Sequence, residues 1–280
     1  MTIEVGAMIG AGVAALVAGL VLVRGRFRAA SSEGKIIVLG PVFAATALAV
    51  FSSEHFTVTR ELSAIVPRWL PDPMFWTYLV GTAWLAAAIS FIAWREVRWS
   101  ASLVAVLMLT IVATIDLPGL PKGAHSRIFW VLTVRETCFA GGAMVLAGSV
   151  WSRGRVLMPI GRVIVGCVFV FYAIEHFLFP HNVPGVPLEK MTPAWVPGAV
   201  VIAYVVGAVL LVAGVCLLIR RRVRMAAAGS GTVLVLLTVF FYVPILVAEF
   251  HSPLADVFDT LLFAATALLA GFGAEAQPAS

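Results

Sequence analysis

The stretch Gly40-Pro41-Val42-Phe43, followed by an apolar run that ends in Ser53-Glu54-His55-Phe56, decides the predicted fold of this chain. A second stretch, from Gly161-Arg162-Val163-Ile164 to Ile174-Glu175-His176-Phe177, repeats it 121 positions later. Two apolar segments that each end in Glu-His-Phe indicate an internal duplication. Each copy would place an acidic residue beside a histidine at the end of a helix.

Composition gives the class of protein. The chain has 280 residues, of which 61% are hydrophobic and 12% are charged, and its mean hydropathy is +1.04. This is far more apolar surface than one soluble domain of this length could bury. We therefore predict an all-α, polytopic membrane protein in contact with the lipid bilayer.

Nine segments are apolar enough to be predicted membrane spans, which need about 20 apolar residues each. The shortest is the fourth, which is bracketed by Arg98-Trp99 and by Asp116-Leu117-Pro118. The predicted spans are 3–23, 36–54, 74–94, 100–115, 128–150, 160–175, 195–219, 231–248 and 254–272.

Basic residues predict the orientation. With the amino terminus outside and the carboxyl terminus in the cytoplasm, 13 of the 19 Lys and Arg residues fall in inner connections, as the positive-inside rule requires. They are Arg24, Arg26, Arg28, Lys35, Arg95, Arg98, Arg153, Arg155, Arg162, Arg220, Arg221, Arg222 and Arg224. The predicted location is the plasma membrane, that is, the inner membrane of a bacterium. Because these loops account for the basic charge, no nucleic-acid partner is predicted.

The repeat continues past its first helix. After a loop that is five residues longer in the second copy, Pro67-Arg68-Trp69-Leu70-Pro71 matches Pro193-Ala194-Trp195-Val196-Pro197, 126 positions later. His125 matches His251 at the same spacing. Four helices per copy, an even number, predict two parallel modules related by a rotation about the membrane normal. The predicted divisions are an N-terminal helix with a basic inner loop (1–35), a first module (36–150) and a second module (157–275).

Histidines and acidic residues are predicted on the opposite side of the membrane from the basic loops. All five histidines and most acidic residues lie at outer span ends or in outer loops, so any ionisable chemistry should face outward. These residues are His55, His125, His176, His181, His251, Glu54, Glu61, Asp116, Glu136, Glu175, Glu249, Asp256 and Asp259.

The motifs resemble those of the DoxX-like four-helix membrane proteins. The shared features are an opening Gly, a helix that ends in Glu-His-Phe, a Pro-x-Trp-x-Pro segment, and the fourth-helix sequence Phe139-Ala140-Gly141-Gly142-Ala143. Members of that family include a membrane subunit of a thiosulfate:quinone oxidoreductase. The resemblance implies quinone-linked chemistry, with quinone as substrate or ligand, and an oxidoreductase partner protein. No other cofactor is evident.

The resemblance transfers the Glu-His pair to Glu54 and His55 and to Glu175 and His176. It also marks Arg135 and Glu136 in the fourth helix of the first copy. The second copy has Leu261-Leu262 at those positions, so the two copies are not expected to carry equivalent sites. Either one module works while the other is structural, or a single site forms between them.

Several explanations of the Glu-His pairs stay open. Ionisable groups in a bilayer are tolerated best in a polar cavity or beside a partner, and Arg135 is an available counter-charge for Glu54 or Glu136. A histidine and a glutamate at one membrane edge could bond a quinone headgroup and relay protons. Alternatively, the imidazole only bonds the last carbonyls of its helix. A metal site would need both pairs to converge, and no HxxxH or CxxC spacing supports one, so no metal is predicted.

Three function classes follow. The first is a quinone-linked membrane redox subunit that receives electrons from a partner, because the chain offers no evident electron carrier. The second is a carrier or exporter for a small molecule or a lipid. The third is a non-catalytic scaffold of a membrane complex. The sequence leaves open whether the protein is an enzyme.

Overall fold

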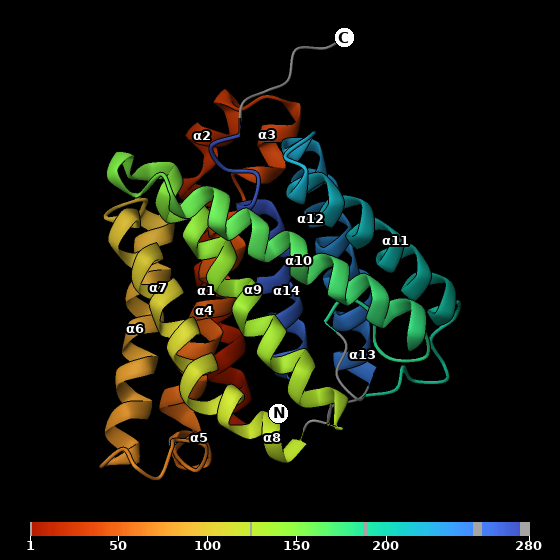
Figure 1. Cartoon of the computed structure of the whole chain (residues 1–280). Coiled ribbons are helices and arrows are strands. Elements are labelled where there is room, and N and C mark those ends of the chain that lie inside the picture. The colour runs from red at the N-terminus through yellow and green to blue at the C-terminus, as the bar shows by residue number, and fades with distance from the viewer. Residues whose placement is uncertain (1, 124, 187–189, 249–253, 275–280) are drawn as a thin grey trace.

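The computed structural model describes every residue except 1, 124, 187–189, 249–253 and 275–280, and the regular elements of the described part are helices (Figure 1). An isolated bridge joins Asn182 and Met191. The α-helices are α1 Ile3–Leu22, α2 Arg24–Ala29, α3 Ser32–Ile37, α4 Gly40–Thr57, α5 Thr59–Ser63, α6 Pro73–Ala93, α7 Val97–Ile111, α8 Leu117–Gly123, α9 Arg127–Val150, α10 Leu157–Leu178, α11 Ala199–Leu218, α12 Val223–Leu237, α13 Val243–Ala248 and α14 Leu254–Leu269. A 3-10 turn, η2 Ser152–Gly154, links α9 to α10, and η1 Val112–Asp116 and η3 Thr238–Tyr242 are π-helical.

Eight helices within the described residues are long and apolar enough to cross a membrane. They are Ile3–Leu22, Ser32–Thr57, Pro73–Ala93, Val97–Pro121, Arg127–Val150, Leu157–Leu178, Ala199–Leu218 and Val223–Ala248, and each overlaps one predicted span. The ninth predicted span corresponds to α14, which has only 16 residues. The prediction of an all-helical integral membrane protein is confirmed at this level.

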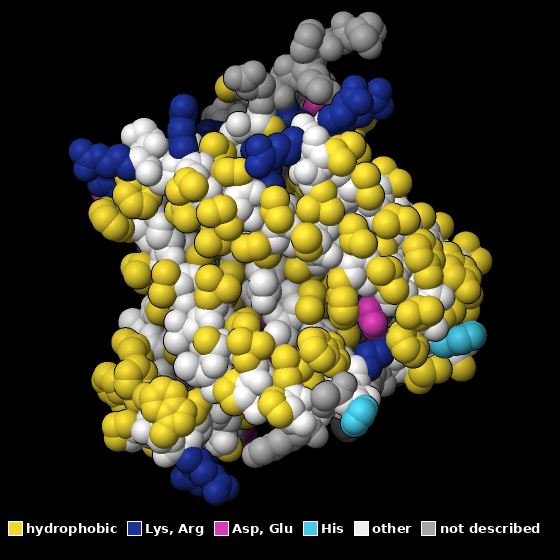
Figure 2. Space-filling view, viewed as in Figure 1, with side chains coloured by type: hydrophobic (Ala, Val, Ile, Leu, Met, Phe, Trp, Pro, Cys, Tyr) yellow, Lys and Arg dark blue, Asp and Glu magenta, His cyan; other side chains and the backbone are white. Residues whose placement is uncertain are grey.

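The outer surface is that of a protein surrounded by lipid. Figure 2 shows apolar side chains over the middle of the molecule and most of the visible Lys and Arg residues at the end where α2 and α3 lie. Large apolar side chains such as Leu103, Val212 and Phe240 are exposed on this surface. A continuous apolar exterior of this kind favours contact with acyl chains over contact with water.

The long helices form a closed ring made of a first half, α4 to α9, and a second half, α10 to α14, and each half packs on the other at two places. Within the first half α4 packs on α6 and α7 on α9, and within the second half α10 packs on α11 and α12 on α14. Between the halves, α9 packs on α10 and α14 packs on α4, while α9 and α14 also touch each other. The fourth long helix of each half therefore lies against the first long helix of the other, and α1 covers α4 and α6 from outside.

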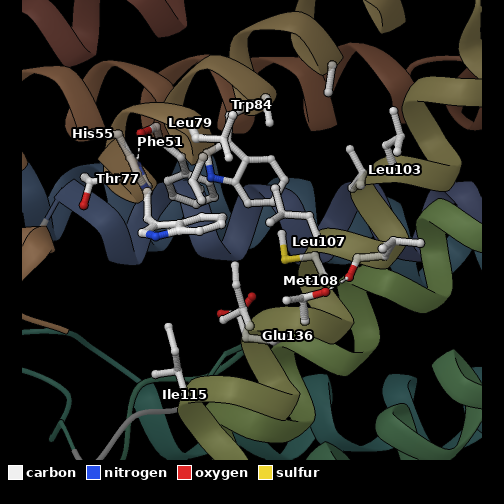
Figure 3. Close-up of a pocket in the computed structure, with 18 of the residues that line it drawn as sticks. Phe51, His55, Thr77, Leu79, Trp84, Leu103, Leu107, Met108, Ile115 and Glu136 are labelled. Atoms are coloured by element: carbon white, nitrogen blue, oxygen red, sulfur yellow. Dashed lines mark hydrogen bonds between the residues drawn. The ribbon is translucent and has the colours of Figure 1, made fainter. Parts of the chain in front are cut away.

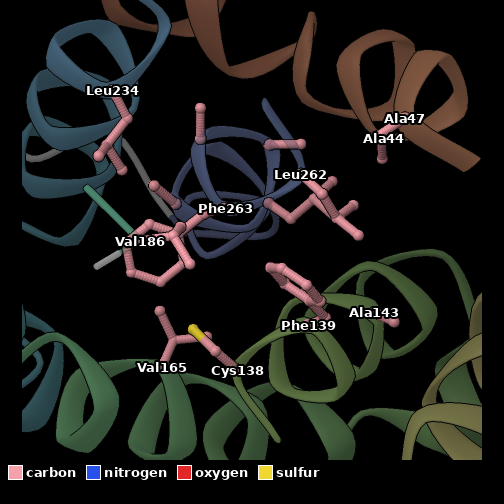
Figure 4. Packing of buried hydrophobic residues seen from close by; sticks show 14 of the residues in the cluster. Ala44, Ala47, Cys138, Phe139, Ala143, Val165, Val186, Leu234, Leu262 and Phe263 are labelled. Atoms are coloured by element: carbon pink, nitrogen blue, oxygen red, sulfur yellow. The ribbon is translucent and has the colours of Figure 1, made fainter. Parts of the chain in front are cut away.

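Helix α14 is the centre of the bundle (Figure 1). Residues 260–270 are each between 0 and 9% exposed, which explains why this stretch carries no charged side chain. Figure 4 shows Leu262 and Phe263 of this helix among side chains from α4, α9 and α10. Its last carbonyl groups are bonded by Arg162 of α10, which donates to Ala270 O at 3.1 Å and to Phe272 O at 2.6 Å.

Glycines allow the two halves to approach closely. A Cβ added to Gly161 of α10 would collide with the carbonyl oxygen of Gly141 in α9, and one added to Gly141 would lie 3.1 Å from the carbonyl oxygen of Gly161. At the other contact between the halves, a Cβ on Gly40 of α4 would lie 3.0 Å from the Leu268 Cβ of α14. Close backbone contact at small residues is the usual way in which helices associate in a bilayer.

Matching backbone geometry recurs in the two halves at a spacing of 126 residues. Trp94 and Glu96 adopt the left-handed conformation, with φ of 53° and 51°, and so do Arg220 and Arg222, with φ of 56° and 51°. The π-helical turns η1 and η3 have the same spacing. Non-glycine residues rarely adopt positive φ, so this agreement is specific. The predicted match of His125 with His251 cannot be followed, because His251 and Glu249 lie outside the described residues.

The prediction that the fourth span ends at Ile115 is wrong, because the helix continues through Pro118 to Gly123. The reason is the π-helical turn before the proline. In η1 the amide of Leu117 bonds the carbonyl of Val112, five residues back, and this wider turn gives the proline ring room. Pro244 follows η3 in the same way, so the helix also passes through it.

The seventh predicted span was started too early, at 195. Helix α11 begins at Ala199, after Gly198 with a φ of 67°. The preceding prolines, Pro193 and Pro197, keep residues 193–197 out of the helix.

The Gly161→Ala substitution tests the exchange between the halves. We expect it to destabilise the protein by about 1–3 kcal/mol, because the new methyl group must push α9 and α10 apart. Thermal unfolding of the purified protein in detergent measures the effect. The matched control is Gly229→Ala in α12, where a Cβ meets open space; it should leave the unfolding temperature unchanged or raise it slightly. Equal effects of the two substitutions would contradict a tight α9–α10 contact.

Candidate functional site

A cavity of about 960 Å³ lies in the first half of the chain, between α4, α6, α7 and α9. Figure 3 shows the labelled side chains that line it, with Phe51 and His55 from α4, Trp84 from α6, Leu107 and Met108 from α7 and Glu136 from α9. Residues of α14, Ala255 and Asp259, complete the wall. The cavity has the size and the mostly apolar walls of a small-molecule binding site.

The cavity opens sideways toward the lipid. Its lining includes Leu79 of α6 and Leu103 and Val106 of α7, and these side chains are 46, 64 and 59% exposed on the apolar exterior. Residues that follow α5, such as Trp69, line the end of the cavity nearest to His55. An apolar molecule dissolved in the bilayer could therefore enter between α6 and α7.

Glu54 and His55 stand in the last turn of α4, and both line the cavity. The Nδ1 atom of His55 is 2.7 Å from the carbonyl oxygen of Phe51, one turn earlier. Gly81 of α6 backs the imidazole, because a Cβ there would lie 2.7 Å from His55 Cβ. The helix contact and the carbonyl together fix the direction of the ring.

A buried ionic cluster joins α9 to α14 at the wall of the cavity. Arg135 Nη1 is 2.6 Å from Asp259 Oδ2, and Arg135 Nη2 is 2.8 Å from Glu136 Oε1. The structure thus pairs Arg135 with Glu136, one of the two partners predicted for it. Charges this deep in a bundle are tolerated when they are paired.

Asp259 was not among the predicted site residues. It lies in α14, 126 positions after Thr133, so the predicted repeat assigns it no acidic counterpart. A carboxylate inside the ninth predicted span, together with an arginine inside the fifth, is the signal that could have revealed the pair.

Glu175 and His176 lie in the second half and have other surroundings. Glu175 forms an ion pair with Arg127 at the start of α9, with Oε2 2.5 Å from Nε. His176 is 2% exposed; its Nδ1 atom is 2.5 Å from the carbonyl oxygen of Tyr172, and its Nε2 atom accepts a hydrogen bond of 2.7 Å from the amide of Gly185. The two Glu-His pairs therefore do not converge on one site.

The loop after α10 fills the space beside His176. Residues 182 and 191 form an antiparallel bridge at its base, and Val183 and Val186 are buried in the core. The Tyr242 hydroxyl donates to the carbonyl oxygen of Pro184 at 2.5 Å. Figure 4 shows Val186 packed close to Leu234 and Phe263. We call the described residues 182–186 the inserted loop.

The inserted loop occupies the counterpart of the cavity. A Cβ on Gly185 would contact Leu237 and lie 3.9 Å from Leu234 Cδ2. The residues 126 positions before these two are Ile111 and Met108, which both line the cavity, and His176 corresponds to His55. The loop that is five residues longer in the second copy thus fills a space that is open in the first.

Among the described residues, no group of three or more His, Cys, Asp and Glu side chains is placed to hold a metal ion. Of the six predicted site residues, four line the cavity, namely Glu54, His55, Arg135 and Glu136. His176 is bonded to the inserted loop, and Glu175 is paired with Arg127. The polar groups that line the cavity are therefore an imidazole, carboxylates, the Arg135 guanidinium and several Ser and Thr hydroxyls.

One protein-family model matches the chain. It describes a domain of unknown function, DUF8561, and covers residues 44–117, from α4 to the start of α8. These residues form three of the helices around the cavity. The matched model is not a DoxX model, so the DoxX resemblance stays a prediction. No curated protein and no solved structure matches the chain.

The Arg135→Leu substitution tests the ionic cluster, and it introduces the residue that the chain carries at position 261. We expect a loss of about 3–5 kcal/mol of stability, because Glu136 and Asp259 would remain buried without a cation. Thermal unfolding in detergent measures it. The control is Arg98→Leu, which breaks an exposed 3.6 Å pair with Glu96 and should cost less than about 1 kcal/mol. A small effect at Arg135 would show that the cluster is hydrated.

Proposed function

We propose that the chain is a tandem duplication of a DoxX-like four-helix module, preceded by one membrane helix, with α14 as the ninth span. The proposal is supported by the equivalent backbone geometries 126 residues apart and by the reciprocal packing of α9 on α10 and α14 on α4. A twofold rotation about the membrane normal would produce reciprocal packing of this kind. The module boundaries are those of the sequence prediction, 36–150 and 157–275.

The first module is a binding site for a quinone-type molecule. The observation that carries this proposal is the 960 Å³ cavity, which opens toward lipid and has ionisable groups at its polar wall. A quinone needs an apolar channel for its tail, flat apolar surfaces for its ring, and hydrogen-bonding groups for its two oxygens. Trp76 and Trp84 supply ring surfaces, and Glu54, His55 and Glu136 supply polar groups.

The second module is structural in this proposal, because the inserted loop takes the place of a ligand. The protein then acts as the quinone-binding subunit of a redox complex in a bacterial inner membrane, and an oxidoreductase partner supplies the electrons. The basic end faces the cytoplasm, so the Glu54–His55 end of the cavity faces outward.

Filling the cavity should remove binding. In Ala83→Phe the new ring enters the cavity from α6, and we expect the affinity for a short-chain benzoquinone to fall by about tenfold or more, since the ring competes for the same volume. Quenching of tryptophan fluorescence in lipid nanodiscs reports binding, because Trp69, Trp76, Trp84 and Trp99 line the cavity.

The matched control is Ala208→Phe on the exposed face of α11, which should leave the affinity unchanged. Quinone binding that is equal in both variants, or undetectable in the wild type, would contradict the proposal. Flux of small molecules or lipids through liposomes that contain only this protein would favour the carrier instead. A phenotype that follows copurifying proteins and ignores cavity substitutions would favour the scaffold.

A further inference from the structure

The second module, which we call the filled module because the inserted loop occupies its interior, shows which hydrogen bonds its histidine makes. The Nδ1 atom of His176 faces the carbonyl oxygen of Tyr172, and a carbonyl oxygen can only accept, so Nδ1 carries the proton. The Nε2 atom accepts from the Gly185 amide at 2.7 Å. His176 is therefore the neutral Nδ1–H tautomer, and it presents a lone pair to the group that fills the module.

His55 is held in the same way in the first module, which we call the open module because it contains the cavity. Its Nδ1 atom donates to the carbonyl of Phe51 at 2.7 Å. Gly81 backs it as Gly207 backs His176, with added Cβ atoms 2.7 and 2.9 Å from the two histidine Cβ atoms. In the neutral form of this ring Nε2 is a hydrogen-bond acceptor, and the equivalent geometry directs it at the space that Gly185 fills in the second module, which here is the cavity that His55 lines.

A second position has changed from a donor to an acceptor. In the filled module the Tyr242 hydroxyl donates to the Pro184 carbonyl. The residue 126 positions earlier is Asp116, whose Oδ2 atom is buried and has no hydrogen-bond partner among the described residues. Asp116 itself is not among the lining residues of the cavity, although its neighbour Ile115 is, so this change is a local difference between the two halves.

We propose that the cavity of the first module selects a ligand that presents a hydroxyl donor to His55 Nε2, and hence the hydroquinone form over the quinone form. The inference rests on the proposed quinone-type function and specifies its ligand. A quinone offers only acceptor oxygens, so it leaves the lone pair of Nε2 without a hydrogen bond, whereas a hydroquinone O–H satisfies the imidazole as the Gly185 amide does in the other half.

The test compares three ligands of nearly the same shape: a short-chain benzohydroquinone kept reduced, its O,O-dimethyl ether, and the corresponding benzoquinone. Isothermal titration calorimetry measures their binding to the wild-type protein in lipid nanodiscs. We expect the hydroquinone to bind about three- to tenfold more tightly than the ether or the quinone, which is the effect of one buried hydrogen bond.

The His55→Phe variant keeps an aromatic ring and removes the acceptor, so it should reduce the preference to less than about twofold. The control is His125→Phe, an exposed histidine outside the cavity, which should keep the full preference. If His55→Phe does not fold, the comparison of the three ligands on the wild-type protein decides alone.

Equal or tighter binding of the ether or the quinone by the wild type would overturn this inference and leave the quinone-type site standing. Binding of none of the three would overturn the proposed function and the inference with it. A preference that survives in His55→Phe would show that another group accepts the hydroxyl, which overturns the role given to Nε2.

Discussion

The structure depends on the close approach of the two halves at their exchanged helices. Gly141 and Gly161 bring the backbones of α9 and α10 together, and Gly40 does the same for α4 and α14. Lipid offers no hydrophobic driving force between helices, so dispersion contacts at such crossings hold the bundle together. Helices α9 and α14 also touch, so their contact lies in the interior of the bundle. The Arg135–Asp259 pair lies at this contact, and both side chains face the cavity of the first half.

One scaffold thus carries two compartments with different contents. The helix order, the π-helical turns and the bond from the histidine Nδ1 to the carbonyl one turn earlier are the same in both. The differences are local: five more residues in one loop, leucines in place of Arg135 and Glu136, and a tyrosine in place of Asp116. These few changes separate a packed half from a half with an open cavity.

Much of the fold follows from the sequence, because a bilayer requires long apolar helices and leaves few alternatives. Eight long apolar helices could be predicted, and Glu136 is one of the two partners predicted for Arg135. The continuation of the fourth span through Pro118 could not be predicted, since it depends on a π-helical turn that no local pattern announces, whereas Pro244 already lies inside the predicted span 231–248. Two further features depend on contacts between residues far apart in the chain, which a local pattern does not predict. They are the packing of the inserted loop into the second half and the pairing of Arg135 with Asp259.

The central position of α14 has a consequence for biosynthesis. This helix leaves the ribosome after every helix that surrounds it, and it is short and carries Asp259 and Asp256 into the bundle. A segment of this kind partitions weakly into lipid by itself. The ring of earlier helices therefore stays open until α14 inserts. Its insertion forms the ion pair between Asp259 and Arg135 and closes the ring in one step.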